Sequence, residues 1–253
     1  MPAPLFVHVP HASPVIPPDC RADFLVDDAG LAAEQLRLTD HHTDELFAEG
    51  WPDGLVWRAP VSRLVVDVER FRDDAAEPCA AVGMGAVYVR GVRGQVLRAP
   101  TPARREVLLE TYYDPHHRAC AAAAGAALAA AGRCVVLDAH SYPRQALPTE
   151  RGGTARPEIG LGTEAFHTPP ALRALAEAFF RQRGFEVDVD EPYSGAFVPT
   201  GFFRTDARVQ ALMVEVRRDL YMDEATGAKH AGFARVQAAL TAFRTELAAY
   251  AAS

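Results

Sequence analysis

The chain has 253 residues, of which 49% are hydrophobic, and a formal net charge of −7. This length accommodates one large domain or two small ones. The acidic balance argues against a nucleic-acid-binding protein, which usually presents a basic face. The sequence contains no uncharged apolar run of about 18 residues, so we expect no membrane span.

The N-terminal stretch and the four cysteines bear on the cellular compartment. The first residues lack the basic segment and cleavage site of a signal peptide, and the cysteines show no CxxC spacing. We therefore expect a cytoplasmic protein with reduced thiols, rather than a secreted protein held by disulfides.

The first predicted element is a short apolar strand over residues 4–10, which runs directly into His11. Prolines at positions 10, 14, 17 and 18 exclude a helix and predict a rigid loop. His11 therefore follows a strand end, where a metal or substrate ligand is often found, although taken in isolation the position favours a surface loop histidine. His8 lies inside the strand and is expected to pack.

Residues 28–49 have the amphipathic pattern of a helix. Asp40 and Asp44 are four residues apart, so a continuous helix presents both on one face. Acidic pairs of this kind usually face solvent. Asp40 gains functional interest only if this segment points toward His11 and His140.

Residues 61–70 alternate apolar and polar side chains and are rich in valine, which predicts a strand. Arg63 and Arg70 lie near its ends and could together bind an anionic substrate. Ion pairs with the surrounding acidic residues explain the same pattern. A second strand is predicted over residues 83–91, paired as a hairpin with the segment that follows it.

A long alanine-rich helix is predicted over residues 102–132, and its His116 and His117 are expected at the surface. The helix leads into CVVLDAHSY (134–142), an apolar strand that ends in polar residues. Open α/β sheets bind ligands beyond the carboxyl ends of their strands, and imidazole is the commonest metal ligand. Taken alone, this segment favours a hydrogen-bonded histidine at a strand end over a ligand, and only its partners elsewhere in the chain change that.

The C-terminal half begins with a proline- and glycine-rich loop over residues 147–170, which is long enough to cover a site. The elements predicted after it are helix 169–183, strand 185–190, strand 207–216 and helix 229–251. Glu215 stands at the end of the last strand. No repeat or linker interrupts this order, so we expect a single α/β domain over residues 1–253.

Taken together, these motifs make the chain resemble the N-formylglutamate amidohydrolase family. The matching stretches are spread in order along the chain: VPHAS (9–13), LTDHHTDELF (38–47), SRLVVDVERF (62–71), LDAHSY (137–142), GTEAFHTP (162–169), EPYSGAFVP (191–199) and VEVRRDLYMDE (214–224). The family is similar in fold to zinc carboxypeptidases and aspartoacylases. The resemblance implies a phosphorylase/hydrolase-like α/β domain with a mixed, mostly parallel sheet flanked by helices.

The resemblance also implies a Zn²⁺ site and a catalytic base. His11 and His140 match two histidine ligands, and Glu215 matches the general base. Carboxypeptidases place a glutamate ligand three residues after the first histidine, where this chain has Pro14, which cannot bind a metal. Related amidases take the acid from the start of the following helix, so Asp40 is the predicted ligand.

Substrate contacts follow from the same resemblance. Arg63 and Arg70 resemble the aspartoacylase arginines that bind the substrate carboxylate and polarise the carbonyl, which gives Arg63 a catalytic role as well. Tyr193, Ser141 and Arg218 are further expected substrate contacts.

The implied activity is hydrolysis of the amide of an N-formyl or short N-acyl amino acid, such as N-formyl-L-glutamate, by metal-activated water. The expected partner is a small anionic substrate. Family members often have Asn where this chain has Glu69 and Arg217, which leaves the substrate open. Two alternatives stay open: an amidohydrolase for another N-acyl amino acid or a small peptide, and a non-catalytic metal- or ligand-binding protein. Cysteine hydrolase chemistry is disfavoured, because no cysteine has the context of a nucleophile.

Overall fold

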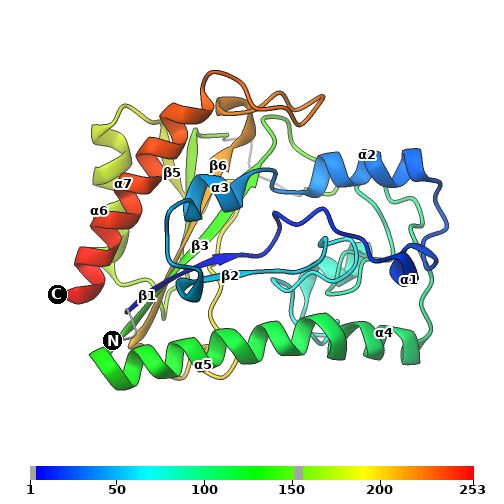
Figure 1. The fold of residues 1–253 in the computed structure, drawn as a ribbon, viewed down its shortest axis with the longest axis horizontal. Coiled ribbons are helices and arrows are strands. Elements are labelled where there is room, and N and C mark those ends of the chain that lie inside the picture. Colours follow the sequence, from blue (N-terminus) through cyan, green and yellow to red (C-terminus); the bar gives the residue numbers. More distant parts are fainter. Residues whose placement is uncertain (1–3, 151–155) are drawn as a thin grey trace.

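A six-stranded sheet lies at the centre of the molecule (Figure 1). The computed structural model describes residues 4–150 and 156–253. In spatial order the strands are β2 (Val56–Arg58), β1 (Leu5–Val9), β3 (Cys134–Tyr142), β6 (Val209–Arg217), β4 (Ile159–Gly162) and β5 (Val187–Val189). The first four strands are parallel, and β4 is antiparallel to β6. The sheet is therefore mixed and mostly parallel.

Helices flank the sheet on both sides (Figure 1). They are α1 (Pro18–Arg21), α2 (Asp28–Leu38), α3 (Thr43–Ala48), α4 (Pro102–Leu108), α5 (Asp114–Ala131), α6 (Pro170–Gln182) and α7 (Phe233–Ala252). One π-helical turn, Leu109–Tyr113, joins α4 to α5 without a break. Among the described residues, no helix is long and apolar enough to cross a membrane. The predicted α/β fold with one mixed, mostly parallel sheet is confirmed.

The two-residue period of a strand decides which side chains face which layer. Odd-numbered residues of β1 and β3, such as Val7 and Leu137, pack with α3, α6 and α7. Even-numbered residues, such as Phe6 and Val136, pack with α5. Both faces are covered, which explains why every residue of β3 is buried.

The strongest sequence patterns are confirmed. Strands β1, β3 and β6 lie where the apolar runs predict them, and α6 and α7 match the predicted helices within a few residues. The helix predicted over residues 102–132 runs through α4, the π-helical turn and α5. His116 on this helix was expected at the surface, and this prediction is wrong, since the side chain is buried.

The strand predicted over residues 61–70 is wrong, since this segment is a series of turns. Its buried carbonyl groups find partners without a strand ladder. The buried Arg98 guanidinium donates to the carbonyl oxygens of Leu64 and Val65, each at 2.7 Å. The strand predicted over 83–91 is also absent from the described chain, and this segment contributes a single isolated antiparallel bridge, from Arg90 to Val96.

The helix predicted over residues 28–49 is broken between α2 and α3. His42 has a φ of 65°, in the left-handed region, and ends any continuous helix. Asp40 and Asp44 therefore do not share one helical face. The break is tied to β1, because the Asp40 backbone N–H donates to the His11 carbonyl oxygen at 3.0 Å.

The sequence patterns do not predict strands β2 and β4, and β4 lies within the segment 147–170 that was predicted to be a loop. The sequence of β4 is IGLG, and because glycines usually weaken a strand, this pattern does not predict one. Here the glycines allow close backbone approach: a Cβ atom at Gly160 would stand 2.8 Å from the Glu191 carbonyl oxygen. The part of that loop at residues 151–155 lies outside the described residues.

Candidate active site

Three chain segments bring polar groups to the carboxyl end of the sheet. His11 follows β1, His140 lies near the end of β3, and Glu215 stands opposite His140 in the register of β3 with β6. The break between α2 and α3 adds Asp40. All four residues are buried, with exposed fractions of 6% or less. Parallel strands that end at one sheet edge thus produce the predicted convergence.

The three predicted metal ligands meet at short distances. His140 Nδ1 lies 3.3 Å from His11 Nδ1 and 3.2 Å from Asp40 Oδ2, and the His11 Nδ1–Asp40 Oδ2 distance is 3.6 Å. Tetrahedral ligands at zinc bond lengths of about 2.0–2.1 Å stand about 3.3 Å apart. The spacing of these atoms therefore suits one small divalent cation held by His11, Asp40 and His140.

Two further carboxylates orient the histidines. His11 Nε2 lies 2.8 Å from Asp67 Oδ1, and His140 Nε2 lies 3.1 Å from Asp138 Oδ1. A neutral imidazole that donates its Nε2–H to a carboxylate has its lone pair on Nδ1. Both Nδ1 lone pairs then point at each other and at the Asp40 carboxylate. Three converging acceptors are stable together only with a cation or an added proton among them.

The electrostatics of the cluster favour positive charge. Burial by itself would raise the pKa of Asp40, but contacts with His11 and His140 hold that pKa well below its ordinary value. Burial opposes protonation of His140, yet the Asp138 and Glu69 carboxylates raise its pKa well above the ordinary value. A bound cation would replace this proton, because metals bind deprotonated ligands.

Asp40 is held from behind by two residues that were expected to contact substrate. Arg218 Nη2 donates to Asp40 Oδ1 at 2.8 Å, and the Ser141 backbone N–H donates to Asp40 Oδ2 at 3.2 Å. Arg218 Nε donates to Ser141 Oγ, and Arg218 Nη1 donates to the Arg37 carbonyl oxygen. Each nitrogen of this buried guanidinium has a partner, so the contacts suit positioning of Asp40.

Glu215 contributes a carboxylate oxygen without a partner. Its Oε2 is buried and makes no hydrogen bond within the part of the chain that the structure describes. Burial raises the pKa of Glu215 to about 8. A buried acceptor left unpaired costs free energy, and a water molecule or a substrate N–H could satisfy it. Glu215 thus has the environment of a group that exchanges protons near neutral pH.

The family model for N-formylglutamate amidohydrolase matches residues 3–222. The chain belongs to the N-formylglutamate amidohydrolase family. Its fold is similar to the crystal structure of an N-formylglutamate amidohydrolase from Ralstonia eutropha, with a TM-score of 0.85 and 26% identity over 98% of this chain and 94% of that one.

A second solved structure shows the same fold. A gene product from Agrobacterium tumefaciens has a TM-score of 0.64 and 19% identity over 97% of this chain and 92% of that one. A comparison with curated proteins found no match.

In this member of the amidohydrolase family, the two arginines of the 61–70 segment differ in availability. Arg63 is paired with Asp67, through Nε at 3.1 Å and Nη2 at 2.9 Å, and its Nη1 lies 3.9 Å from Asp40 Oδ1. Arg70 Nε lies 3.7 Å from Asp67 Oδ2, and this buried nitrogen has no hydrogen-bond partner among the described residues. Arg70 is therefore the arginine with donors left for a ligand.

Tyr193 lies in the segment between β5 and β6. Its hydroxyl donates to Glu150 Oε1 at 2.6 Å, and its ring packs edge-on against Tyr142 at the end of β3, with centroids 6.0 Å apart. Glu150 belongs to the loop that was predicted to cover a site. This contact connects the loop to the carboxyl end of the sheet.

Sequence reasoning missed the carboxylates behind the two histidines. Asp67 and Asp138 are fully buried. Asp138 had a usable signal, since it precedes His140 by two residues on one strand face. Asp67 had none, because the segment predicted as a strand is a turn that directs the carboxylate toward His11.

Proposed function

We propose that the chain is a metal-dependent amidohydrolase that removes the formyl group from an N-formyl amino acid such as N-formyl-L-glutamate. One observation carries the proposal: three converging metal-type acceptors stand beside a buried carboxylate oxygen that has no hydrogen-bond partner among the described residues, in a chain of this family. The structurally similar protein from Ralstonia eutropha supports the substrate class by its name.

His11, Asp40 and His140 are the proposed ligands, and their two nitrogens and one oxygen fit zinc. Bound there, the ion polarises the scissile carbonyl and increases the acidity of water. Asp67 and Asp138 keep the Nε2 protons of the histidines in place. Arg218 and Ser141 fix the Asp40 carboxylate.

Glu215 is the proposed general base. Its carboxylate accepts a proton from the attacking water, whose oxygen forms a bond to the carbonyl carbon. The carbon–nitrogen bond then breaks, and Glu215 returns the proton to the leaving nitrogen. The products are formate and the free amino acid. A protein that only binds metal needs no such base, so the Glu215 oxygen, which has no partner in the described part of the chain, favours an enzyme over a binding protein.

The substrate carboxylate is assigned to Arg70, with Arg63 beside it on the same Asp67 carboxylate. Tyr193 is proposed as a further substrate contact. A guanidinium with free donors binds a carboxylate through two parallel hydrogen bonds. Arg63 is held by Asp67 close to Asp40, a position that suits stabilising negative charge on the carbonyl oxygen.

Amidation of the α-carboxyl group of N-formyl-L-glutamate is expected to lower kcat/KM by about 10- to 100-fold, the loss expected for hydrogen bonds to a charged group. Steady-state formate release from the acid and its α-amide measures this. In Arg70→Met the kcat/KM values for the acid and for its α-amide should become similar. Arg72→Met is the matched control, because Arg72 pairs with Glu106 and Asp114. Equal rates for acid and amide in the natural protein would refute the assignment.

A panel of N-acyl amino acids tests the proposed substrate class. N-formyl-L-glutamate, its N-acetyl analogue, N-formyl-L-leucine and a small dipeptide differ in the acyl group, the side-chain charge and the leaving group. The highest kcat/KM is expected for N-formyl-L-glutamate. A preference for the acetyl compound or the dipeptide would identify a different amidohydrolase on the same scaffold. No turnover of any member, with metal bound, would favour a binding protein.

A further inference from the structure

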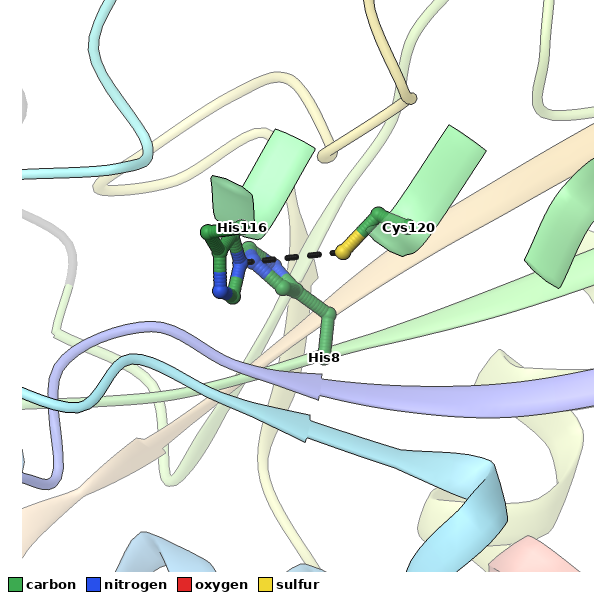
Figure 2. A group of neighbouring side chains, drawn as sticks. All are labelled: His8, His116 and Cys120. Atoms are coloured by element: carbon green, nitrogen blue, oxygen red, sulfur yellow. Dashed lines mark hydrogen bonds between the residues drawn. The ribbon is translucent and has the colours of Figure 1, made fainter. Parts of the chain in front are cut away.

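A second group of buried side chains lies behind the proposed metal site. His8 of β1 and His116 and Cys120 of α5 gather between the sheet and the helix (Figure 2). His8 and Cys120 are fully buried, and His116 is 7% exposed. His8 is an even-numbered residue of β1, so it faces α5, as does Asp138 on β3. This group is therefore joined to the site through the sheet face that carries His140.

The hydrogen-bond distances form one chain from the helix to His140. His116 Nε2 lies 2.9 Å from His8 Nε2, and His8 Nδ1 lies 2.9 Å from Asp138 Oδ1. The same Asp138 oxygen is 3.1 Å from His140 Nε2, and Asp138 Oδ2 accepts from the Phe197 backbone N–H at 2.8 Å. Phe197 also stacks on the His8 ring with centroids 3.7 Å apart, which fixes the plane of the imidazole.

The direction of each proton follows from the chemistry of the groups. Burial lowers the pKa of His8 to about 3 and that of His116 to about 2, so both rings are neutral. Asp138 as a carboxylate can only accept, so His8 donates its Nδ1–H and carries a lone pair on Nε2. His116 must then donate its Nε2–H to that lone pair.

We propose that His8 and His116 are positioning residues for His140: through Asp138 they fix the carboxylate that keeps the Nδ1 lone pair of His140 directed at the metal. The inference rests on the proposed function, since it concerns a ligand of the proposed ion. Carboxylates behind metal-binding histidines raise metal affinity by orienting the ring, and partners of those carboxylates extend the same effect.

A second metal ion held by His8, His116 and Cys120 is the competing interpretation. The 2.9 Å separation of the two Nε2 atoms is that of an N–H···N hydrogen bond, which satisfies both rings without an ion. Cys120 Sγ lies 3.7 Å from His116 Nε2. Burial raises the pKa of the Cys120 thiol, whereas a metal ligand must be a thiolate. The contacts therefore favour the hydrogen-bonded chain.

The test compares two variants of His116 by their zinc affinity. His116→Phe fills the space of the ring without a donor, and His116→Gln keeps an N–H near the position of Nε2. Competition with a chromophoric chelator should show that the Phe variant binds zinc about tenfold more weakly, while the Gln variant stays within about twofold of the natural protein. Melting curves check that both are folded, and His116→Leu replaces the Phe variant if it is not.

Cys120→Ala and cobalt substitution separate this proposal from a second metal site. The proposal expects one ion per chain, unchanged in Cys120→Ala, and no sulfur-to-cobalt charge-transfer band. Two ions per chain, with one lost in Cys120→Ala, would overturn it. Equal zinc affinity of the natural, Phe and Gln proteins would also overturn it while leaving the proposed function intact. Failure of the natural protein to bind any metal would instead refute the proposed function, and this inference with it.

Discussion

Glu215→Gln is expected to lower kcat by about 10²- to 10⁴-fold, the usual cost of removing general acid–base catalysis. Glutamine preserves the shape of the side chain but cannot accept the proton of the attacking water. The proposed metal ligands are untouched, so the zinc content should stay at one ion per chain. Rates with N-formyl-L-glutamate and elemental analysis of the same preparation measure both quantities.

Asp219→Asn is the matched control for this variant. Asp219 is an acidic residue that follows β6. Its carboxylate pairs with the Arg217 guanidinium at 2.7 Å, and both side chains are partly exposed. Loss of such a pair costs about 0–1 kcal/mol of stability and should leave kcat nearly unchanged. A normal kcat in zinc-loaded Glu215→Gln would end the assignment of Glu215 as the base.

In the metal-free protein, Glu215→Gln is also expected to change how stability depends on pH. The pKa of Glu215 is about 8 in the folded chain and is ordinarily 4.5. Folding therefore favours the protonated form, and this contribution to stability is complete below pH 4.5 and is lost as pH rises toward 8. Glutamine does not titrate. The free energy of unfolding of Glu215→Gln, relative to that of the natural protein, should therefore rise by up to about 1.4 kcal/mol per pH unit between pH 5 and 8.

His140→Ala should abolish both metal binding and hydrolysis while the chain stays folded. His140 supplies one of three acceptors, and its removal leaves a histidine and a carboxylate, too few for a stable zinc site. Elemental analysis, formate release and circular dichroism test the three parts. His230→Ala, at an exposed histidine, is the control and should retain the ion. Full zinc occupancy in folded His140→Ala would exclude His140 as a ligand.

Asp40 is a less clean position for the same experiment. The Arg218 guanidinium, 3% exposed, loses its carboxylate partner if Asp40 becomes alanine. Breaking a buried ion pair in this way costs about 3–5 kcal/mol. Loss of metal from an Asp40 variant could therefore follow from unfolding, which is why the His140 variant tests the ligand set better.

The fold followed from the sequence where hydrophobic patterns were strong. The apolar run 134–137 before His140 and the mostly apolar run 209–214 before Glu215 predict strands in an α/β order, and both are strands. The segment over residues 61–70 shows the limit, because its alternation is that of a strand. Its conformation depends on Arg98, more than 25 residues away in sequence, which bonds the carbonyl groups of Leu64 and Val65.

Some residues of the candidate site could be predicted from local sequence patterns, and others could not. His11, His140 and Glu215 could be singled out because each stands at the end of a strand. Asp40 required the family resemblance, since its sequence context predicts a continuous helix and the structure has a break there. The support of the site by Arg218 and by His8 and His116 depends on tertiary contacts between distant segments, which no local pattern contains.

Titration of metal-free protein with zinc, followed by formate release from N-formyl-L-glutamate, tests the central claim most directly. If His11, Asp40 and His140 form the one metal site of the amidohydrolase, the protein should have negligible activity without zinc. The rate of formate release should then rise linearly with added zinc and level off at one ion per chain. Full activity in the metal-free protein, or none at any zinc concentration, would contradict it.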